Sequence, residues 1–300
     1  MATWLLLGLV SALFLGFYDV VKKLSVNENA VLPVLFWSNV TAAVLWLPMI
    51  VYSTRTADPS LLGLLYVDPL DSGQHLQLFL KACIVGSSWI CSYFALKHLP
   101  VSIAGPIRAT SPFWTLLGAL VLLSERPSGM QWAGIAVTLI CFAWFSLAGR
   151  KEGIHFRSNH WVWLMVLATL IGAGSGLYDK FLLAHAGFSA ATVQAWFSVY
   201  LVLFMTPLYL GWKFRLWERK DFEWRWTIPA IAVCLLIADF AYFLALKEPE
   251  ALVSVLSPIR RGSVLIVFSS GFLLLGEVNF RHKIGPLIGI LCGILLIVST

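Results

Sequence analysis

The sequence predicts an all-α integral membrane protein, with ten transmembrane helices arranged as two inverted five-helix repeats around a central cavity. Three observations favour this fold class. Hydrophobic residues make up 59% of the 300-residue chain and charged residues only 12%, about half the charged share of a soluble domain. Apolar stretches long enough to cross a bilayer recur along the chain. Three sequence blocks of the first half return in the second half in the same order.

The net charge of +6 does not indicate nucleic-acid binding, because the basic residues fall in short loops between apolar runs. Basic loops beside membrane spans instead report topology. The five cysteines lie within apolar runs without a Cys-x-x-Cys pair, which predicts buried, reduced thiols and no metal site. The first apolar run has no basic residues before it and no small-residue cleavage site, so we expect a retained helix and not a signal peptide.

Ten windows along the chain have the length and apolar character of a membrane-crossing helix, which needs about 20 mostly apolar residues. The connections between the windows are short. In order, the predicted spans are residues 3–21, 31–52, 77–96, 101–123, 129–148, 161–182, 191–211, 227–246, 251–274 and 283–300.

An internal repeat divides the chain into residues 1–150 and 151–300. "GFYDVVKK" from Gly16 matches "GLYDKFLL" from Gly176, and "YFALKHLP" from Tyr93 matches "YFLALKEP" from Tyr242. The third and longest match pairs residues 105–125 with 257–277, beginning with Pro-Ile-Arg and ending with Glu. The conserved order predicts duplication. Five spans per half, an odd number, predict that the second half is inverted in the membrane, as in many secondary transporters.

The lysines and arginines toward each side of the membrane predict an orientation. Thirteen fall on one side: Lys22, Lys23, Lys97, Arg150, Lys151, Arg157, Lys213, Arg215, Arg219, Lys220, Arg225, Arg281 and Lys283. Five fall on the other: Arg55, Lys81, Arg126, Lys180 and Lys247. Because cytoplasmic loops are enriched in basic residues, this count predicts that both termini lie outside.

The two five-helix halves, each with a fourth helix that ends in "LLSE" or "LLGE" (Glu125 and Glu277), resemble the drug/metabolite transporter superfamily, EamA type. The resemblance covers almost the whole chain. It implies that the first four helices of each half line a central path, that the fifth and tenth are peripheral, and that small metabolites such as amino acids are moved. It also implies cytoplasmic termini, in conflict with the charge count, and a bacterial plasma (inner) membrane location.

Six ionisable residues fall within or near the predicted spans, where an Arg or Asp at the helix centre costs about 2.5–3.5 kcal/mol. Such residues normally face the protein interior or a water-filled cavity. Depth along the helices allows Asp19 to pair with Arg108, and Asp179 or Asp239 to pair with Arg260. The six are Asp19, Arg108, Asp179, Asp239, Arg260 and Arg261.

Arg108 and Arg260 are the predicted ligands of an anionic substrate group such as a carboxylate, because the guanidinium fork matches two carboxylate oxygens. The alternative is that the arginines only neutralise neighbouring aspartates and hold helices together. Arg261 has no counterpart in the first half, which favours this ion-pairing role. Tyr93, Tyr242 and Trp89 are the aromatic candidates for the cavity wall, with simple packing as their alternative.

Asp239 has two opposed interpretations. It could carry a proton and couple transport to the proton gradient, or it could pair with Arg260 and stay charged. Asp19 and Asp179, with Tyr18 and Tyr178, end the repeated Gly-x-Tyr-Asp. They are predicted either as a gate at each mouth or as caps at the membrane interface.

The predicted function is secondary active transport, by alternating access, that exports a small polar metabolite such as an amino acid or related carboxylate. The expected partners are the bilayer, that small molecule and, as a candidate coupling ion, protons, but no nucleic acid. No P-loop, GxGxxG or HExxH occurs and we assign the histidines to loops, so we expect no enzymatic activity, no cofactor and no metal. Two alternatives stay open: a membrane enzyme acting on a lipid-linked substrate, and a receptor or assembly protein without transport.

Overall fold

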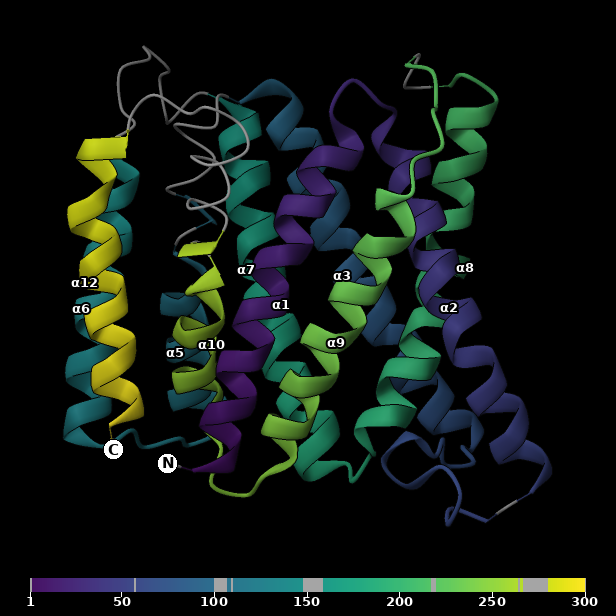
Figure 1. Cartoon of the computed structure of the whole chain (residues 1–300), viewed down its shortest axis with the longest axis horizontal. Helices are drawn as coiled ribbons and strands as arrows, with labels where there is room; N and C mark the ends of the chain where they lie inside the picture. Colours follow the sequence, from purple (N-terminus) through teal and green to yellow (C-terminus); the bar gives the residue numbers. More distant parts are fainter. Residues whose placement is uncertain are drawn as a thin grey trace.

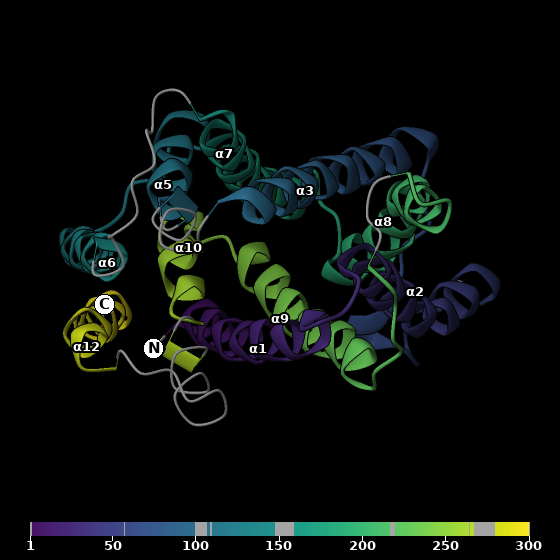
Figure 2. The same cartoon turned by 90° about the horizontal axis from the view of Figure 1, so that it is seen from above.

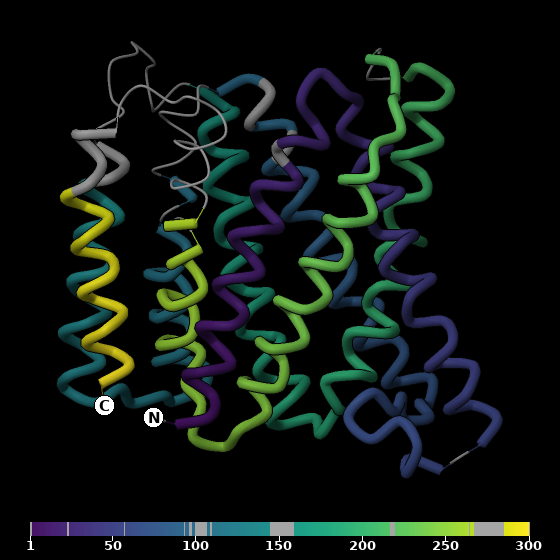
Figure 3. The backbone as a smooth tube through the Cα atoms, viewed as in Figure 1, coloured from purple at the N-terminus to yellow at the C-terminus, as the bar shows by residue number. Residues whose placement is uncertain are grey.

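The computed structural model describes residues 2–56, 58–99, 107–108, 110–147, 159–216, 220–263, 265–266 and 280–299. Within these ranges the secondary structure is all helical, with ten α-helices, one 3₁₀ turn and one π-helix. The helices stand side by side and run alternately up and down (Figure 1). The backbone trace begins and ends on the same side of the molecule (Figure 3).

The helix boundaries agree with most predicted spans to within five residues. Two predicted spans are interrupted: Thr110 is in a turn before α5 within 101–123, and Gly262 is in a turn after α10 within 251–274. The first half contains α1 (Thr3–Val26), α2 (Val31–Arg55), the 3₁₀ turn η1 (Gly63–Leu65), α3 (Ser72–His98), α5 (Ser111–Leu122) and α6 (Gly129–Leu147). The second half contains α7 (His160–Lys180), the π-helix η2 (Phe181–His185), α8 (Ala190–Lys213), α9 (Thr227–Lys247), α10 (Val253–Arg261) and α12 (Phe280–Val298).

Five helical stretches are long and apolar enough to cross a membrane by length and composition, in the part of the chain that is described. They are Thr3–Val26, Val31–Arg55, His160–His185, Ala190–Lys213 and Thr227–Lys247. Three further helices are apolar but shorter, namely Ser111–Leu122, Gly129–Trp144 and Gly285–Val298. The ten-span prediction is therefore matched in part by these criteria.

Each helix packs mainly against a helix of the other half. The closest pairs are α1 with α9, α3 with α7, α2 with α8, and α6 with α12. Viewed from above, α6 and α12 lie at one end of the molecule and α2 and α8 at the other (Figure 2). Helices α1, α3, α7, α9 and α10 lie between these two ends.

Glycines allow α6 and α12 to pack closely. A side-chain carbon added at Gly134 would lie 2.7 Å from the carbonyl oxygen of Gly293, and one added at Gly293 would lie 2.9 Å from the carbonyl oxygen of Gly134. Gly285 and Gly289 precede Gly293 at four-residue intervals and meet Trp144 and Cys141 of α6 in the same way. Small residues at this spacing let two backbones approach inside a membrane.

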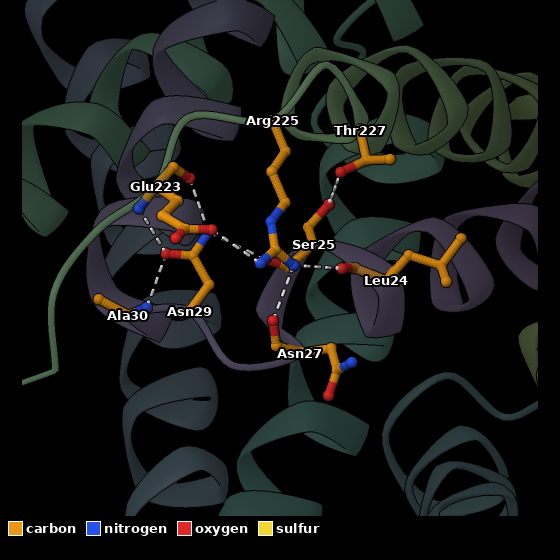
Figure 4. Close-up of polar contacts among 8 residues, drawn as sticks. All are labelled: Leu24, Ser25, Asn27, Asn29, Ala30, Glu223, Arg225 and Thr227. Carbon is orange, nitrogen blue, oxygen red and sulfur yellow. Dashed lines mark hydrogen bonds and ion pairs between the residues drawn. The ribbon is translucent and has the colours of Figure 1, made fainter.

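On the side opposite the termini, the turn after α1 is held to the segment before α9 by polar contacts (Figure 4). The buried Asn29 side chain donates to the carbonyl oxygen of Glu223 at 2.7 Å and accepts from its N–H at 2.9 Å. Arg225 donates to the carbonyl oxygens of Leu24 and Asn27, which lie at the end of α1 and just beyond it. We call the residues Ser25, Asn29, Glu223, Arg225 and Thr227 the loop clasp.

Candidate functional site

Lys81 and Asp179 form a buried ion pair between α3 and α7. A capping box sets the start of α3: Asp71 accepts from the Gln74 N–H at 2.8 Å, and the Gln74 side chain accepts from the Asp71 N–H at 3.0 Å. Lys81 lies nine residues after Ser72, roughly 13 Å along the helix. Its Nζ donates to Oδ1 of Asp179, and the two side chains are only 3% and 9% exposed.

Two aromatic rings enclose the Lys81 ammonium. Its Nζ lies 4.5 Å from the ring centroid of Phe197 in α8 and 4.9 Å from that of Phe243 in α9. Cations are attracted to aromatic faces, most strongly where water is excluded. The ammonium is therefore held by one carboxylate and two ring faces contributed by three helices.

Arg260 and Asp239 form a second ion pair between α10 and α9. Nη2 of Arg260 donates to Oδ1 of Asp239 at 2.6 Å, and both side chains are 19% exposed. The guanidinium carbon lies 4.0 Å from the ring centroid of the buried Tyr242. Tyr242 lies one turn from Asp239 on α9. Its ring thus covers one face of the Arg260 guanidinium, while Asp239 binds the edge of the same group.

The two ion pairs belong to one cluster. Asp179 interacts electrostatically with Asp239 and Arg260 in addition to Lys81. Two cations and two anions give Lys81, Asp179, Asp239 and Arg260 a formal net charge of zero, and we call these four residues the charged cluster. It joins α3 of the first half to α7, α9 and α10 of the second.

Arg260 keeps a donor that no described protein group uses. Its Nε is buried and has no hydrogen-bond partner among the described residues. A buried donor without an acceptor is costly, and such groups call for an explanation. An oxygen-bearing ligand at the Nε edge would satisfy this donor without displacing Asp239 from Nη2.

Glu125 determines where α10 begins and so where Arg260 lies. Its carboxylate accepts from the N–H groups of Val253 and Ser254 at 2.7 and 3.0 Å, and from the Ser254 hydroxyl at 2.5 Å. A carboxylate is favoured at a helix N-terminus, where backbone N–H groups lack partners. Glu125 is buried and is thus a helix cap supplied by the other half of the chain.

Arg261 lies next to Arg260 in the chain and links the charged cluster electrostatically to other predicted residues. It interacts electrostatically with Arg108, Asp19 and Arg260. Arg108 is exposed in the described segment 107–108. Of the predicted pairings, the structure therefore brings Arg260 to Asp239 directly and Asp179 close to both, whereas Asp179 has Lys81 as its bonded partner.

The remaining predicted residues lie in different settings. Tyr18 is buried beneath the Lys22 ammonium, which lies 5.2 Å from its ring centroid, while Tyr178 donates to the carbonyl oxygen of Gln77 at 3.2 Å. Trp89 is half-buried and packs against a cluster that contains Phe197. The side chain of Tyr93 lies outside the described residues.

Sequence reasoning missed Lys81 as a site residue, because the orientation count placed it among the basic residues on the outer side of the membrane. It lies only four residues inside the predicted span 77–96, so hydropathy alone could not separate it from a loop lysine. The signal that could have found it is the capping pair Asp71 and Gln74, which starts the helix earlier. Lys180, also counted outside, is buried and donates to the carbonyl oxygens of Leu246 and Glu248.

The assignment of all histidines to loops is wrong for five of them, since the described helices contain His75 and His98 in α3, His160 in α7, His185 in η2 and His282 in α12. His155 lies outside the described residues. The Nδ1 of His75 is 2.7 Å from the hydroxyl of Tyr200. In the part of the chain that is described, no group of three or more His, Cys, Asp or Glu side chains could hold a metal ion.

Comparisons with known proteins agree with this architecture. Residues 2–147 match the model of the EamA-like transporter family. A solved structure described as "Crystal structure of protein" shares the fold, with a TM-score of 0.71 over 98% of this chain and 95% of that chain, at 14% sequence identity. No curated protein matches the sequence.

Proposed function

We propose that this chain, whose residues 2–147 match the model of the EamA-like transporter family, is a membrane transporter of the drug/metabolite type, and that it works as a secondary active transporter. Its substrate in this proposal is a small polar metabolite, such as an amino acid or a related carboxylate, which it exports by alternating access. The proposed location is the plasma (inner) membrane of a bacterium.

The observation that carries the proposal is the buried Nε of Arg260, which has no hydrogen-bond partner among the described residues although the side chain as a whole is 19% exposed. Ionisable residues inside a membrane protein usually mark a substrate or ion pathway. Arg260 is oriented by Asp239 and covered by Tyr242, so its remaining edge has a fixed direction. A substrate carboxylate at that edge would gain a charge-assisted hydrogen bond.

The pattern of helix contacts supports two inverted repeats, residues 1–150 and 151–300. Let α1 exchange with α7, α2 with α8, α3 with α9, and α6 with α12. Then the contact of α1 with α9 becomes that of α7 with α3, and the contact of α2 with α9 becomes that of α8 with α3. The contacts of α2 with α8 and of α6 with α12 map onto themselves.

Alternating access follows from this proposed symmetry. A twofold-related pair of halves can exchange conformations, which opens a midplane site to one side and then to the other. The charged cluster joins the two halves through Lys81 and Asp179, so a change in its charge state acts on their contact. Asp19 and Tyr18 on α1, with Asp179 and Tyr178 on α7, remain our proposed gate residues.

Uptake into proteoliposomes tests the proposal. A pool of labelled amino acids and small mono- and dicarboxylates is offered to wild-type protein, Arg260→Ala and Asp239→Asn, with size-exclusion profiles to check folding. We expect wild type to transport at least one pool member and both variants to lose that transport while still folded. Absence of transport by wild type would refute the function, and unchanged transport in both variants would refute the site.

A further inference from the structure

The two ion pairs of the charged cluster differ in what they can do with a proton. The guanidinium of Arg260 stays protonated under all physiological conditions, so Asp239 always has a cation beside it. Lys81 Nζ and Asp179 Oδ1 form the ion pair in a drier setting, where the two side chains are 3% and 9% exposed against 19% for both members of the other pair. An unpaired charge on either Lys81 or Asp179 is therefore more costly than one in the more exposed Arg260–Asp239 pair.

The Lys81–Asp179 pair also breaks the internal symmetry. The repeated Gly-x-Tyr-Asp matches Asp179 with Asp19, but the repeated Tyr-Phe block matches Lys81 with Ala230. The equivalent position of the other half therefore has no ammonium. The cluster is asymmetric between the two sides of the molecule, with its lysine in the half of α3 nearer the termini.

We propose that Asp179 is the residue that takes up and releases one proton for each net-anionic carboxylate that is moved. This inference rests on the proposed function. Without substrate the charged cluster has no net charge, so the two halves can close over it. A carboxylate bound at Arg260 Nε adds one negative charge, and a proton on Asp179 restores neutrality.

The proton balance of the cycle is explicit. In a conformation open to water, the Asp179 carboxylate accepts a proton from water or hydronium and forms an O–H bond, while Lys81 keeps its own proton and is free to turn toward the substrate carboxylate. After the halves close and reopen on the other side, the substrate leaves, the O–H bond breaks and the proton passes to water. The Lys81–Asp179 ion pair then forms again, and the empty neutral cluster returns.

The direction of net movement depends on the gradients, because the proton and the anion travel together. A carboxylate that leaves the cell down its own gradient carries a proton outward with it. An imposed gradient of one pH unit, acidic on the side of addition, should accumulate the substrate about tenfold at equilibrium, since 1.4 kcal/mol corresponds to a factor of ten.

Other charged and titratable groups near Asp179 are placed differently. From α7 itself, Tyr178 bonds to a backbone carbonyl beside α3 and Lys180 to two carbonyls at the end of α9. From α8, a ring and not an ionisable group faces the pair. The remaining groups are Lys81 of α3, Asp239 and Tyr242 of α9, Arg260 and Arg261 of α10, and Glu125, which interacts with Lys180.

The test separates proton-driven accumulation from exchange. Proteoliposomes with wild type, Asp179→Asn or the exposed control Asp58→Asn receive the labelled pool described above. One set has an imposed pH gradient, and the other has unlabelled substrate inside and no gradient. Asparagine imitates a permanently protonated Asp179, so we expect this variant to lose gradient-driven accumulation by about tenfold per pH unit while its exchange stays within about twofold of wild type. Asp58→Asn should behave as wild type in both.

Each other outcome is decisive. If wild type transports a net-anionic carboxylate and the extent of accumulation does not depend on the pH gradient, the inference is overturned and the proposed function stands. No transport at all would overturn both. Loss of exchange in folded Asp179→Asn would also overturn it. If the single variant fails to fold, the double variant Lys81→Met/Asp179→Asn removes the buried charges together, and retained dependence on the pH gradient in that protein would overturn the inference.

Discussion

Lys81 and Asp179 show how a charge is kept inside this protein, with one bonded partner, two ring faces and very little water. Buried ion pairs add little net stability, because desolvation offsets most of their attraction. Removal of one partner costs much more free energy of unfolding than removal of both, because the remaining charge is then unpaired in a site with little water. The pair should therefore be visible in stability measurements independently of transport.

Lys81→Met and Asp179→Asn should each destabilise the protein by about 3–5 kcal/mol, whereas the double variant should lose much less than the sum. Thermal unfolding of the four proteins in detergent measures this as a double-mutant cycle. Additive losses would mean that the two residues do not interact, contrary to the structure.

Glu125→Gln should destabilise the protein by about 1–2 kcal/mol, the usual cost of losing a helix cap. Glutamine can accept through only one oxygen and carries no charge toward the N-terminus of α10. Thermal unfolding again gives the comparison, with the exposed Glu250→Gln as the matched control. Equal melting temperatures for the two variants would contradict the capping role.

The sequence predicted Arg260 because a pair of arginines is conspicuous in an apolar stretch, and it predicted Asp239 within reach of Arg260 from depth along the helices. It could not predict that Asp179 would bond to Lys81. Depth along a helix is readable from sequence, but which face meets which neighbour depends on three-dimensional packing. The unused Nε of Arg260 is likewise a property of geometry.

Among the helices, α6 and the part of α12 from Gly285 onward contain no charged residue. Close backbone approach at glycine positions contributes to their contact, and a hydropathy plot does not display it. The ends of helices depend on caps instead: Asp71 and Gln74 begin α3 five residues before the predicted span, and the loop clasp fixes the end of α1 against the start of α9.

Gly293→Ala should weaken the α6–α12 contact by about 1–3 kcal/mol, the typical cost of overpacking. The new methyl group would lie 2.9 Å from the Gly134 carbonyl oxygen, with the Thr138 hydroxyl closer still. Gly174→Ala in α7 is the matched control, since a methyl group there meets nothing within 4 Å. A thermal-stability assay in detergent should rank the control above Gly293→Ala, and the opposite order would contradict the packing.

Asn29→Ala should destabilise the loop clasp by about 1–3 kcal/mol, because it removes both hydrogen bonds that the buried Asn29 side chain makes with the backbone of Glu223. Asn27→Ala is the control, since Asn27 contributes only its backbone carbonyl. Hydrogen exchange at the end of α1 and the start of α9 provides a local readout. Faster exchange there is expected for Asn29→Ala alone, and equal protection in both variants would argue against the clasp.

On the scale of the whole molecule, the described chain ends lie on one side, and the described basic residues of the larger predicted group lie toward the other (Figure 1). Two of the five residues counted on the terminal side, Lys81 and Lys180, are buried. Three remain against thirteen, so the bias is stronger than the sequence count indicated. The resemblance to EamA-type transporters implies the opposite orientation.

We predict from this bias that both termini face outward. A reporter that is active only outside the cytoplasm, fused to the C-terminus, should be active, and a cysteine-directed impermeant label should reach a cysteine placed at Ser299 in intact cells. Labelling only after the membrane is opened would show that the family orientation holds. The same reporter fused at Asn27, on the side of the loop clasp, serves as the control and should be inactive.

The central claim is that the Nε edge of Arg260 within the charged cluster binds a carboxylate. Equilibrium binding of a labelled carboxylate that wild type transports, measured on purified protein, tests it most directly against the double variant Asp239→Asn/Arg260→Gln, which removes both charges of the pair. The account predicts saturable binding at one site per wild-type chain and a loss of affinity of about tenfold or more in the double variant, since a hydrogen bond to a charged group contributes about 1.5–3 kcal/mol. Equal affinity in the two proteins would contradict it.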